Sequence, residues 1–245
     1  MNRYYYDLHL HSCLSPCADD DNTPNNIAGM ATLCGLNIVA LTDHNSAKNC
    51  PAFFEAAKRY GIIPVAGMEL TTSEDIHVIC LFEALEAALQ FDSELQAHRM
   101  LIPNRTDIFG NQLILNGQDE LIGTEPHFLS NATDISIEAV PTLVKPFGGV
   151  CYPAHIDRPA NGIISVLGTF PQTPYFTCAE MNRREKTAEY LERYPLLRDK
   201  HIIVSSDAHY LTDMRDKENY FELDDEPYSS TLVRQRLFER LRVAP

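Results

Sequence analysis

The chain has 245 residues, enough for one or two domains, and 44% of them are hydrophobic, so it can bury a sizeable core and is not expected to be disordered. Its 20 Lys and Arg residues against 34 Asp and Glu residues give a formal net charge of −14. A surface of that sign repels phosphate backbones, which argues against long nucleic acids as partners but leaves room for a small phosphorylated ligand held through metal ions.

The first hundred residues alternate predicted strands with predicted helices. Strand-forming residues occur at 4–9, 37–41, 62–66 and 76–82. Thr23-Pro24 and Gly35 mark the start and end of one helix, and Pro51 and Gly61 mark those of another. Such strand–helix–strand repeats predict parallel strands joined by helical crossovers.

The second half continues the alternation after an interruption. Further strands are predicted at 149–154, 175–181 and 201–205, with helices over 185–193 and 232–241. Residues 98–148 break the rhythm, and they contain a predicted hairpin in which Asn116-Gly117 joins 113–115 to 120–122. We interpret them as an inserted lid or edge element of a single domain covering 1–245, because a structureless loop of that length is rare. Seven strands predict an α/β barrel one unit short of the usual eight.

Apolar runs and cysteines predict a protein of the cytoplasm that does not enter a membrane. The longest apolar runs, such as 37–41, are far shorter than a membrane span, and the first residues lack the apolar core of a signal peptide. The seven cysteines are an odd number without paired spacing, which suits a reducing compartment.

Most histidines fall at the ends of the predicted strands. These are His9, His11, His44, His77, His155 and His209, accompanied by the carboxylates Glu69 and Asp207. His77 is the exception, because it lies at the start of its strand. In a parallel barrel the carboxyl ends of the strands converge on one rim, where sites are built. Imidazole and carboxylate suit zinc, manganese or iron, and one ion needs three or four protein ligands, so the pattern predicts two or three divalent ions.

Five motifs contain these residues. They are Asp7-Leu8-His9-Leu10-His11-Ser12, Thr42-Asp43-His44, Gly67-Met68-Glu69, Pro153-Ala154-His155 and Ser206-Asp207-Ala208-His209. In this order they resemble the successive motifs of the PHP (polymerase and histidinol phosphatase) superfamily, over residues 5 to about 210. The resemblance implies a distorted seven-stranded (β/α)7 TIM-like barrel, a trinuclear metal site and hydrolysis of phosphate esters.

The resemblance also implies how the ligands are shared. His9, His11, Glu69 and Asp207 would hold one ion, Glu69 with His77 and His155 a second, and His44 with His209 the third. The family usually supplies one further His or Asp from the loop after the first motif. Counting back from Thr23 favours Asp19, counting forward from His11 reaches Cys17, and Asp20 is a further candidate. We take Asp19 as the predicted ligand.

The chemistry expected of such a site is in-line displacement at phosphorus by a metal-activated hydroxide, with Glu69, Asp207 and His209 as catalytic residues. Arg158, three residues after His155, is predicted to bind the substrate phosphate, although an ion pair with a nearby acid would explain it equally well. Arg183 and Arg184 are weaker candidates for the same role.

Asp7 and Asp43, next to predicted ligands, are expected either to orient imidazoles or to be ordinary residues at strand ends.

The sequence therefore predicts a metal-dependent phosphoesterase that acts on a small phosphorylated metabolite or nucleotide, as a mono- or diester. Two alternatives stay open. An amidohydrolase-type enzyme that cleaves C–N bonds also begins with His-x-His on a barrel strand, but no lysine here occupies the place of its bridging lysine. A non-catalytic protein that binds metal or senses a phosphorylated metabolite would be expected to have a degenerate site.

Overall fold

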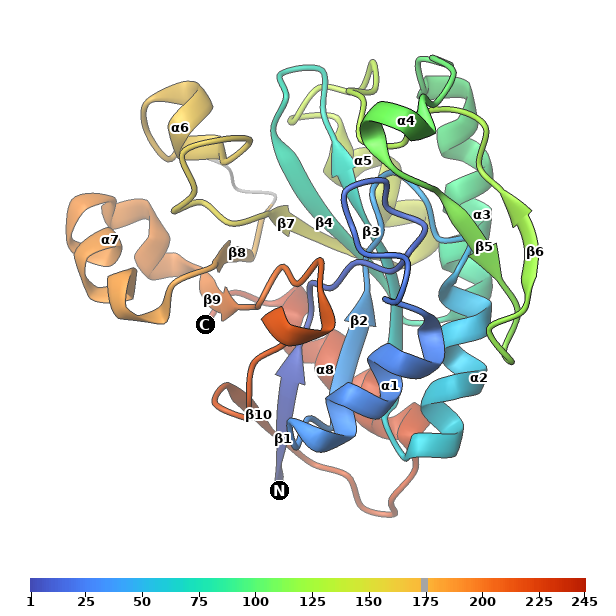
Figure 1. Ribbon diagram of the computed structural model, residues 1–245. Helices are drawn as coiled ribbons and strands as arrows, with labels where there is room; N and C mark the ends of the chain where they lie inside the picture. The colour runs from blue at the N-terminus through green and yellow to red at the C-terminus, as the bar shows by residue number, and fades with distance from the viewer. Residues whose placement is uncertain (173–175) are drawn as a thin grey trace.

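The computed structural model describes residues 1–172 and 176–245, which form an α/β fold around a curled sheet (Figure 1). Six strands make this sheet, in the order β10-β1-β2-β3-β4-β7. They are β1 (Asn2–Asp7), β2 (Ile38–Leu41), β3 (Ile63–Thr71), β4 (His77–Phe82), β7 (Val150–Pro153) and β10 (Tyr220–Leu223). Two further pairs are β5 (Leu113–Leu115) with β6 (Leu121–Thr124), and β8 (Cys178–Met181) with β9 (His201–Val204).

The direction of the strands differs from the prediction. β1, β2 and β3 are parallel, as expected. β4 runs antiparallel to both β3 and β7, and β10 runs antiparallel to β1, so the sheet is mixed. The expectation of parallel strands throughout was wrong because only residues 72–76 join β3 to β4, and so short a connection can join only antiparallel neighbours.

The β8–β9 pair lies between β7 and β1. The backbone amide of Ile156, beyond β7, donates to the carbonyl of Glu180 at 2.8 Å, and that of Asp207, beyond β9, donates to the carbonyl of His9 at 3.0 Å. β8 is parallel to β9, and Leu10 and Ala208 form an isolated parallel bridge. The first residue of the predicted strand 175–181, Tyr175, lies outside the described residues.

Helices cover the outside of the sheet and one of its ends (Figure 1). They are α1 (Pro24–Leu33), α2 (Cys50–Tyr60), α3 (Leu85–Leu95), α4 (Thr106–Phe109), α5 (Val140–Val144), α6 (Ile163–Leu167), α7 (Thr187–Arg193) and α8 (Ser230–Arg242). Short 3₁₀ helices lie at Gln96–His98, Lys145–Phe147, Arg184–Lys186, Pro195–Asp199 and Leu211–Asp213. Within the described ranges no helix combines the length and apolarity needed to cross a bilayer.

Helices α1 and α2 begin and end where the sequence indicates. The Thr23 side chain accepts a hydrogen bond from the Asn26 amide, with Pro24 as the first helical residue. Gly61 ends α2 at φ 71°, a left-handed conformation that glycine adopts without steric cost.

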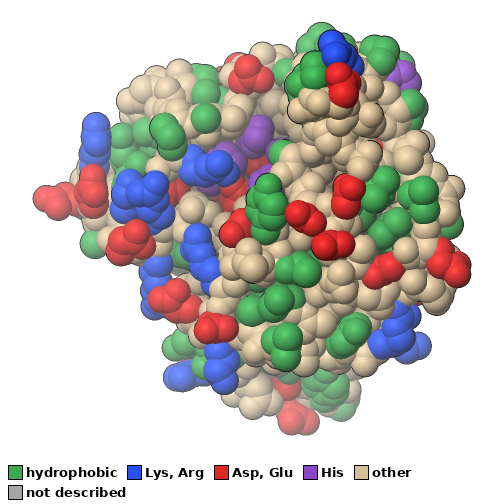
Figure 2. Space-filling model, in the orientation of Figure 1, with side chains coloured by type: hydrophobic (Ala, Val, Ile, Leu, Met, Phe, Trp, Pro, Cys, Tyr) green, Lys and Arg blue, Asp and Glu red, His purple; other side chains and the backbone are tan. Residues whose placement is uncertain are grey.

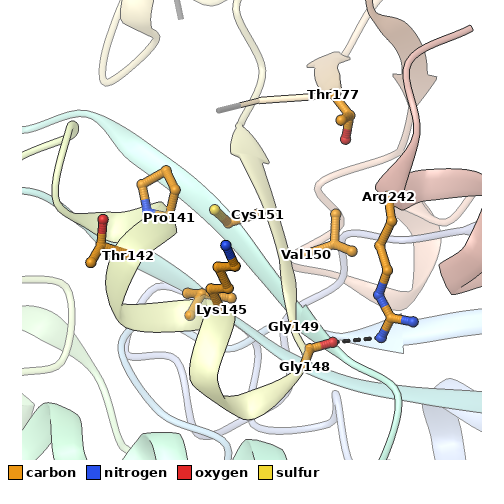
Figure 3. A pocket seen from close by; sticks show the side chains of 10 residues that line it. Pro141, Thr142, Lys145, Gly148, Gly149, Val150, Cys151, Thr177 and Arg242 are labelled. Carbon is orange, nitrogen blue, oxygen red and sulfur yellow. Dashed lines mark hydrogen bonds between the residues drawn. The ribbon is translucent and has the colours of Figure 1, made fainter. Parts of the chain in front are cut away.

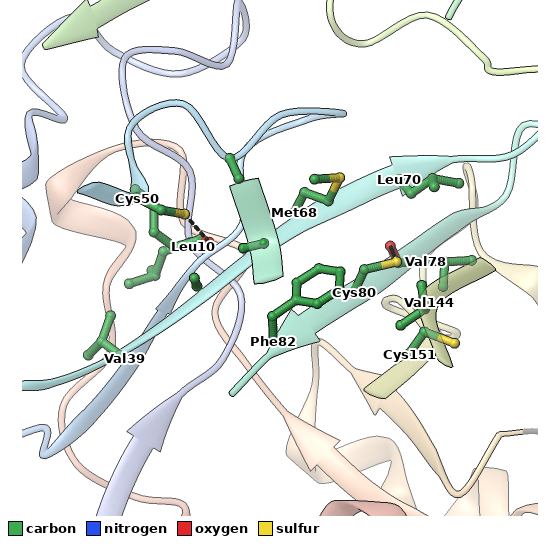
Figure 4. Packing of buried hydrophobic residues seen from close by; sticks show 14 of the residues in the cluster. Leu10, Val39, Cys50, Met68, Leu70, Val78, Cys80, Phe82, Val144 and Cys151 are labelled. Atoms are coloured by element: carbon green, nitrogen blue, oxygen red, sulfur yellow. Dashed lines mark hydrogen bonds between the residues drawn. The ribbon is translucent and has the colours of Figure 1, made fainter. Parts of the chain in front are cut away.

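Alternate residues of the strands contribute to two separate cores. Val39 and Leu41 of β2 pack outward against α1 and α2, in the cluster of Figure 4, which also includes Met68 and Phe82. Residues of the opposite parity, such as Ile38, pack inward against the apolar face of α8. α8 thus covers the end of the curled sheet where β1–β3 begin, which leaves the other end for polar residues (Figure 1).

Residues 98–148 contain α4, α5 and the predicted hairpin, formed by antiparallel β5 and β6. The hairpin is tied to the loops after β1 and before α2, by a hydrogen bond from the Leu113 amide to the Cys13 carbonyl at 2.8 Å and by the side chain of Asn49, which donates to the Leu113 carbonyl at 3.0 Å. Asn45, beside His44, donates to the carbonyl of Leu129 at 2.7 Å. This segment therefore borders the rim formed by the strand ends.

Candidate metal centre

The histidines and carboxylates singled out in the sequence come together at that rim. They are His9 and His11 after β1, His44 after β2, Glu69 near the end of β3, His77 at the start of β4, His155 after β7, and Asp207 and His209 after β9. His77 and His209 are partly exposed and the other six are buried. Figure 2 shows imidazoles at the bottom of a hollow on this face of the molecule.

The antiparallel direction of β4 explains why His77 joins the cluster from the start of a strand. In the β3–β4 register Thr71 lies opposite His77, so the first residue of β4 lies beside the last residue of β3. The His77 carbonyl also accepts a hydrogen bond from the Ala154 amide at 3.0 Å, which brings His155 alongside. His77 is therefore at the same rim as the ends of the parallel strands.

His9, His11, Glu69 and Asp207 form one group of donor atoms. His9 Nε2 lies 3.1 Å from His11 Nε2 and 3.2 Å from Asp207 Oδ1, and His11 Nε2 lies 3.3 Å from Asp207 Oδ1. The two nitrogens are 3.3 and 3.4 Å from Glu69 Oε1 and Oε2. Zinc with bonds of about 2.0–2.1 Å to four tetrahedral ligands separates them by about 3.3 Å. The spacing of these donor atoms therefore fits a tetrahedral metal ion.

Two of these oxygens are also without hydrogen bonds. Glu69 Oε2 and Asp207 Oδ1 are buried, and neither has a hydrogen-bond partner among the described residues although nitrogens lie within 3.4 Å. Buried polar atoms are nearly always satisfied, so two orphaned carboxylate oxygens facing imidazoles need an explanation. A cation between them would provide it, and the residues therefore fit a metal site.

Glu69 is shared with a second group of histidines. Its Oε1 lies 2.8 Å from His77 Nδ1 and 3.0 Å from His155 Nε2, and its Oε2 lies 3.0 Å from His44 Nδ1. His44, Glu69 and His77 form a second possible donor group, and His11, His44 and His209 a third. His44 thus lies between the second and third groups.

Both carboxylates are held in the ionised form. Burial favours the neutral form of Glu69, but nearby imidazoles, that of His77 first, outweigh it and hold the pKa of the carboxyl well below its usual range. Burial is likewise outweighed at Asp207, where His9 and His11 lower the pKa. At neutral pH the cluster therefore offers two anionic oxygen ligands, as a divalent cation requires.

The loop after the first motif brings Cys17, not Asp19, to the cluster. Its backbone turns twice, through bonds from the Ser15 amide to the Ser12 carbonyl and from the Ala18 amide to the Ser15 carbonyl, both 3.0 Å. These turns place the Cys17 thiol against His44 and His209. Cys17 is an exposed residue; partial desolvation of its thiol opposes ionisation, but the two imidazoles lower its pKa to about 4. Cys17 therefore lies beside His44 and His209 of the third donor group.

Asp19 and Asp20 point elsewhere. The Asp19 carboxylate accepts a hydrogen bond from the Asp21 amide at 2.8 Å, and Asp20 accepts one from the Asn111 side chain at 2.6 Å, both at the surface. Neither belongs to a donor group in the described part of the chain. Cys17 does not belong to a donor group either, so Asp19, Asp20 and Cys17 all stay candidates for the loop ligand, and Cys17 is the one whose side chain lies next to imidazoles of the cluster.

Three residues of the rim have a left-handed backbone without being glycine. Asn45 has φ 46°, His155 has φ 26° and Asp207 has φ 56°. Such conformations cost about 1–3 kcal/mol each, and they are concentrated at functional sites, where the surrounding structure enforces them. The strain here is located at two candidate ligands and beside a third, which supports a functional role for this rim.

Glu180 is a site residue that the sequence analysis did not identify as functional. It is buried in β8, and its Oε1 lies 2.8 Å from His9 Nδ1 and accepts a hydrogen bond from the His155 amide at 3.1 Å. A carboxylate behind a ligand imidazole fixes the ring so that the other nitrogen faces the metal. The sequence feature that could have identified Glu180 is an acidic residue inside an otherwise apolar strand.

Asp43 and Asp7 act at different places. Asp43 accepts a hydrogen bond from the Ser15 hydroxyl at 2.7 Å, and that hydroxyl lies 3.0 Å from His11 Nδ1, so Asp43 orients His11 through Ser15. Asp7 accepts from the backbone amides of His9 and Ser206 at 3.3 and 3.2 Å. Asp7 therefore joins two motifs by their backbones and does not orient an imidazole.

Arg158 lies at the edge of the cluster, with its side chain 45% exposed, and forms an ion pair with Asp207. An ion pair with a nearby acid was the alternative role expected for Arg158, and its partner is Asp207; the nearer Asp157 instead accepts hydrogen bonds from the amides of Asn182 and Arg183 at 2.8 and 2.9 Å. The guanidinium is thus close enough to the candidate ligands to contact a substrate bound there.

A separate cavity of about 640 Å³ lies near the start of β7, away from the cluster (Figure 3). Lys145, Val150, Cys151 and Arg242 are among the residues that line it, and Arg242 Nη2 donates to the Gly148 carbonyl at 2.7 Å. No candidate ligand lines this cavity, so its size does not make it the site of the chemistry.

Solved structures with a similar fold include several hydrolases. Endonuclease Q from Pyrococcus furiosus matches with a TM-score of 0.66 at 16% identity, over 98% of this chain and 56% of that one. An amidohydrolase from Chromobacterium violaceum matches with a TM-score of 0.54 at 19% identity, over 98% of each chain. A protein from Bifidobacterium adolescentis described as a metal-dependent phosphoesterase matches with a TM-score of 0.53 at 18% identity, over 84% of this chain and 88% of that one. These structural similarities show that the chain shares this fold.

Sequence comparisons identify the family. An error-prone DNA polymerase of Nocardia farcinica is 40% identical over 67 residues, which are 27% of this chain and 6% of that one. A 5'-3' exoribonuclease of Haemophilus influenzae is 34% identical over 79 residues, which are 31% of this chain and 28% of that one. The match thus spans only a minor part of each relative. The model of the PHP domain matches residues 7–145, more than half of the chain, and the chain therefore belongs to the PHP domain family.

Proposed function

We propose that this protein is a metal-dependent phosphoesterase that hydrolyses a phosphate ester with two or three divalent ions of zinc, manganese or iron. The observation that carries the proposal is the position of Glu69, whose carboxylate oxygens lie 2.8–3.4 Å from nitrogens of five imidazoles. A carboxylate shared in this way can bridge two neighbouring ions. Membership of the PHP domain family supports the same proposal.

The proposed ligands divide into three sets. His9, His11, Glu69 and Asp207 hold one ion, Glu69 with His77 and His155 a second, and His44, His209 and Cys17 a third. When bound, the ions supply Lewis acidity, which neutralises the non-bridging oxygens of the ester and lowers the pKa of water. The catalytic residues proposed are Glu69, Asp207 and His209.

His209 and Arg158 complete the proposed chemistry. His209 Nδ1 lies 2.9 Å from the Asp207 carbonyl and donates to it, which leaves Nε2 as a base or ligand on this partly exposed ring. A cation bound by Asp207 would compete with Arg158 for that carboxylate. The guanidinium of Arg158 would then be free to bind a phosphate through two parallel hydrogen bonds, which makes it the proposed substrate-binding residue.

The proposed substrate is a small phosphorylated metabolite or a nucleotide, as a mono- or diester. The net charge of −14 argues against long nucleic acids. Two similar proteins are nevertheless named as nucleases, and one structure of endonuclease Q holds a 27-mer duplex with an abasic lesion at the active site. The end of a short strand therefore stays within the proposal.

We also propose that residues 1–245 form one domain, in which β8 and β9 complete a distorted (β/α)7 barrel and 98–148 are an insertion that borders the rim. The hydrogen bonds that link β8 to β7 and β9 to β1 support this arrangement. All seven cysteines are free, which is compatible with the proposed location in the cytoplasm.

The test is metal analysis and hydrolysis on one purified sample. Bound zinc, manganese and iron should be quantified, and phosphomonoesters, nucleotides, a phosphodiester, amides and lactones assayed with each metal. We expect two or three ions per chain and hydrolysis of a phosphomonoester to phosphate, or of the phosphodiester to a monoester, that a chelator abolishes. Activity on amides or lactones alone would favour an amidohydrolase. Bound metal without turnover on any ester would favour a binding protein.

A pair of variants sharpens this test. Glu69→Gln preserves the shape of the side chain and should lose metal and activity together. Asp225→Asn is the matched control, because Asp225 is also a buried carboxylate but accepts its hydrogen bond from Tyr4 at 2.6 Å, near the start of β1. Full turnover in Glu69→Gln would refute the proposal that the Glu69 carboxylate is shared between two ions.

A further inference from the structure

Cationic side chains gather beside the metal centre although the chain as a whole carries −14. A hollow of about 580 Å³ is lined by Arg183, Arg184 and Arg215, together with Asn182, Glu185 and Glu218. We name it the arginine hollow. A second hollow of about 380 Å³ adjoins it through Arg183, and Arg158 and Lys186 line that one. Figure 2 shows Lys and Arg side chains grouped to the left of the histidines, on the same face.

The arginine hollow is fixed to the loops that carry the candidate ligands. Asn182 directly follows β8, and its side chain donates to the carbonyl of Ser206, the neighbour of Asp207, at 2.8 Å. The Asp157 carboxylate accepts from the amides of Asn182 and Arg183, and Asp157 lies two residues after His155. The backbone that carries Arg183 is therefore fixed next to the loops that carry the candidate ligands.

The charge of the hollow is only partly compensated from within the protein. Arg184 pairs with Glu218 at 3.2 Å, where both side chains are more than half exposed, and Arg215 donates to the Asn182 carbonyl at 2.6 Å. The guanidinium of Arg183, an exposed residue, has no hydrogen bond or ion pair with any described residue, whereas its backbone amide is bound by Asp157. The two hollows together are lined by five Arg and Lys side chains against three acids, and the carboxylate of Asp157 is committed to backbone amides.

An uncompensated arginine in a concave site is suited to an anion, and guanidinium matches phosphate in geometry as well as charge. The volume is within the range of small-ligand sites. We propose that the arginine hollow binds a second phosphate group of the substrate, while the first is hydrolysed at the metal centre. The preferred substrate then carries two phosphates. This inference rests on the proposed function for the identity of the first group.

Two sources could provide that second phosphate, a small bisphosphorylated metabolite or the neighbouring phosphate of a short nucleic-acid strand. The experiment compares a sugar bisphosphate with its monophosphate, and a thymidine dinucleotide with and without a 5′ phosphate. Both kcat/KM and equilibrium affinity by calorimetry are measured, because binding reports on the hollow even if no turnover occurs. For each pair, kcat/KM and affinity for the doubly phosphorylated member are divided by those for the singly phosphorylated member, and the pair with the larger ratio identifies the source.

The variants are Arg183→Ala, Arg183→Lys and Arg183→Ala with Arg215→Ala. Charge-assisted hydrogen bonds of this kind change affinity by about 10- to 100-fold, so Arg183→Ala should reduce the preference for the doubly phosphorylated ligand by that factor, and Arg183→Lys should restore part of it. Arg236→Ala removes the same charge on α8, where Arg236 pairs with Glu239, and should leave the preference unchanged.

The outcomes distinguish the second-phosphate site from the proposed function. A wild-type protein that binds both members of each pair equally, or a preference that survives the double variant, would overturn the second-phosphate site. A preference in binding that Arg183→Ala abolishes, without hydrolysis of any ligand, would support the hollow and refute the phosphoesterase.

Discussion

Replacing Glu180 tests whether the carboxylate behind His9 positions that ring. Glu180 is 1% exposed, and its Oε1 lies 2.8 Å from His9 Nδ1 and 3.1 Å from the His155 amide nitrogen. If His9 donates its Nδ1 proton to this carboxylate, Nε2 is left free to bind metal. Glu180→Gln keeps the shape and one acceptor oxygen but removes the charge, whereas Glu180→Leu removes the acceptor.

The expected magnitudes follow from these two contacts. Changing the carboxylate behind a metal-binding histidine alters metal affinity or activity by about 10–100-fold, which is about 1.4–2.7 kcal/mol. Glu180→Gln should fall near the lower value because His9 keeps an acceptor, and Glu180→Leu near the upper. Glu180→Leu also leaves two buried donors unpaired, at about 1–3 kcal/mol each, so the free energy of unfolding without metal should fall by about 2–6 kcal/mol.

The assay is metal affinity by competition with a chelator, together with denaturant unfolding in the presence and absence of metal. Asp225→Leu is the control for general destabilisation, because it removes a buried acceptor from Tyr4 and Asn2 far from the cluster. That variant should lose stability but keep the metal affinity of the folded protein. Equal metal affinity in Glu180→Leu and Asp225→Leu would refute the positioning role.

Three further predictions concern the loop, the substrate and the insertion. With cobalt as the probe metal, Cys17→Ser should abolish thiolate-to-metal absorption, whereas Cys34→Ser should retain it; retained absorption in Cys17→Ser would exclude this ligand. Arg158→Ala should raise KM about 10-fold with a smaller change in kcat, and an unchanged KM would make Arg158 a structural residue. Glu125→Gln should destabilise the protein, because the buried Arg99 loses its partner at 3.3 Å. Burial at Glu125 is outweighed by Lys48 and Arg99, which lower the pKa of its carboxyl from the ordinary 4.5. The stabilisation is therefore present above about pH 4.5 and is lost as the pH falls through the lower pKa of the folded state. A difference in the free energy of unfolding between wild type and Glu125→Gln that does not shrink in acid would contradict this.

The rim residues could be predicted from the sequence because they follow strands whose local signals are strong. Runs such as Ile38–Leu41 are apolar and bounded by turn residues, so the polar residues just beyond them can be located without knowing the fold. Glu180 could not be assigned in this way, because it lies inside β8 and its role depends on His9, which is 171 residues away in the chain. Residues that orient ligands are defined by tertiary neighbours and leave a weaker trace in the sequence.

Asp19, the predicted loop ligand, lies outside the donor groups for a related reason. Counting residues from His11 or from Thr23 assumes that the loop advances evenly, whereas two backbone turns fold it back and the Asp19 amide donates to the His209 carbonyl at 3.0 Å. The turns bring Cys17 to the cluster and leave the Asp19 side chain at the surface. A soft thiolate in place of a carboxylate should shift the third set of ligands towards zinc or iron and away from manganese.

The place of His77 shows how strand direction decides which residues can share a site. A rule based on the carboxyl ends of strands excludes His77, yet the hairpin of β3 and β4 reverses the chain and brings a strand's first residue to the same rim. Glu69 lies opposite Ile79 in the register, so His77 is its diagonal neighbour two residues along, and long side chains span that diagonal. The contact of 2.8 Å between them therefore depends on the length of the turn at 72–76. Adding one residue there would shift the register and turn His77 to the other face of the sheet, away from Glu69.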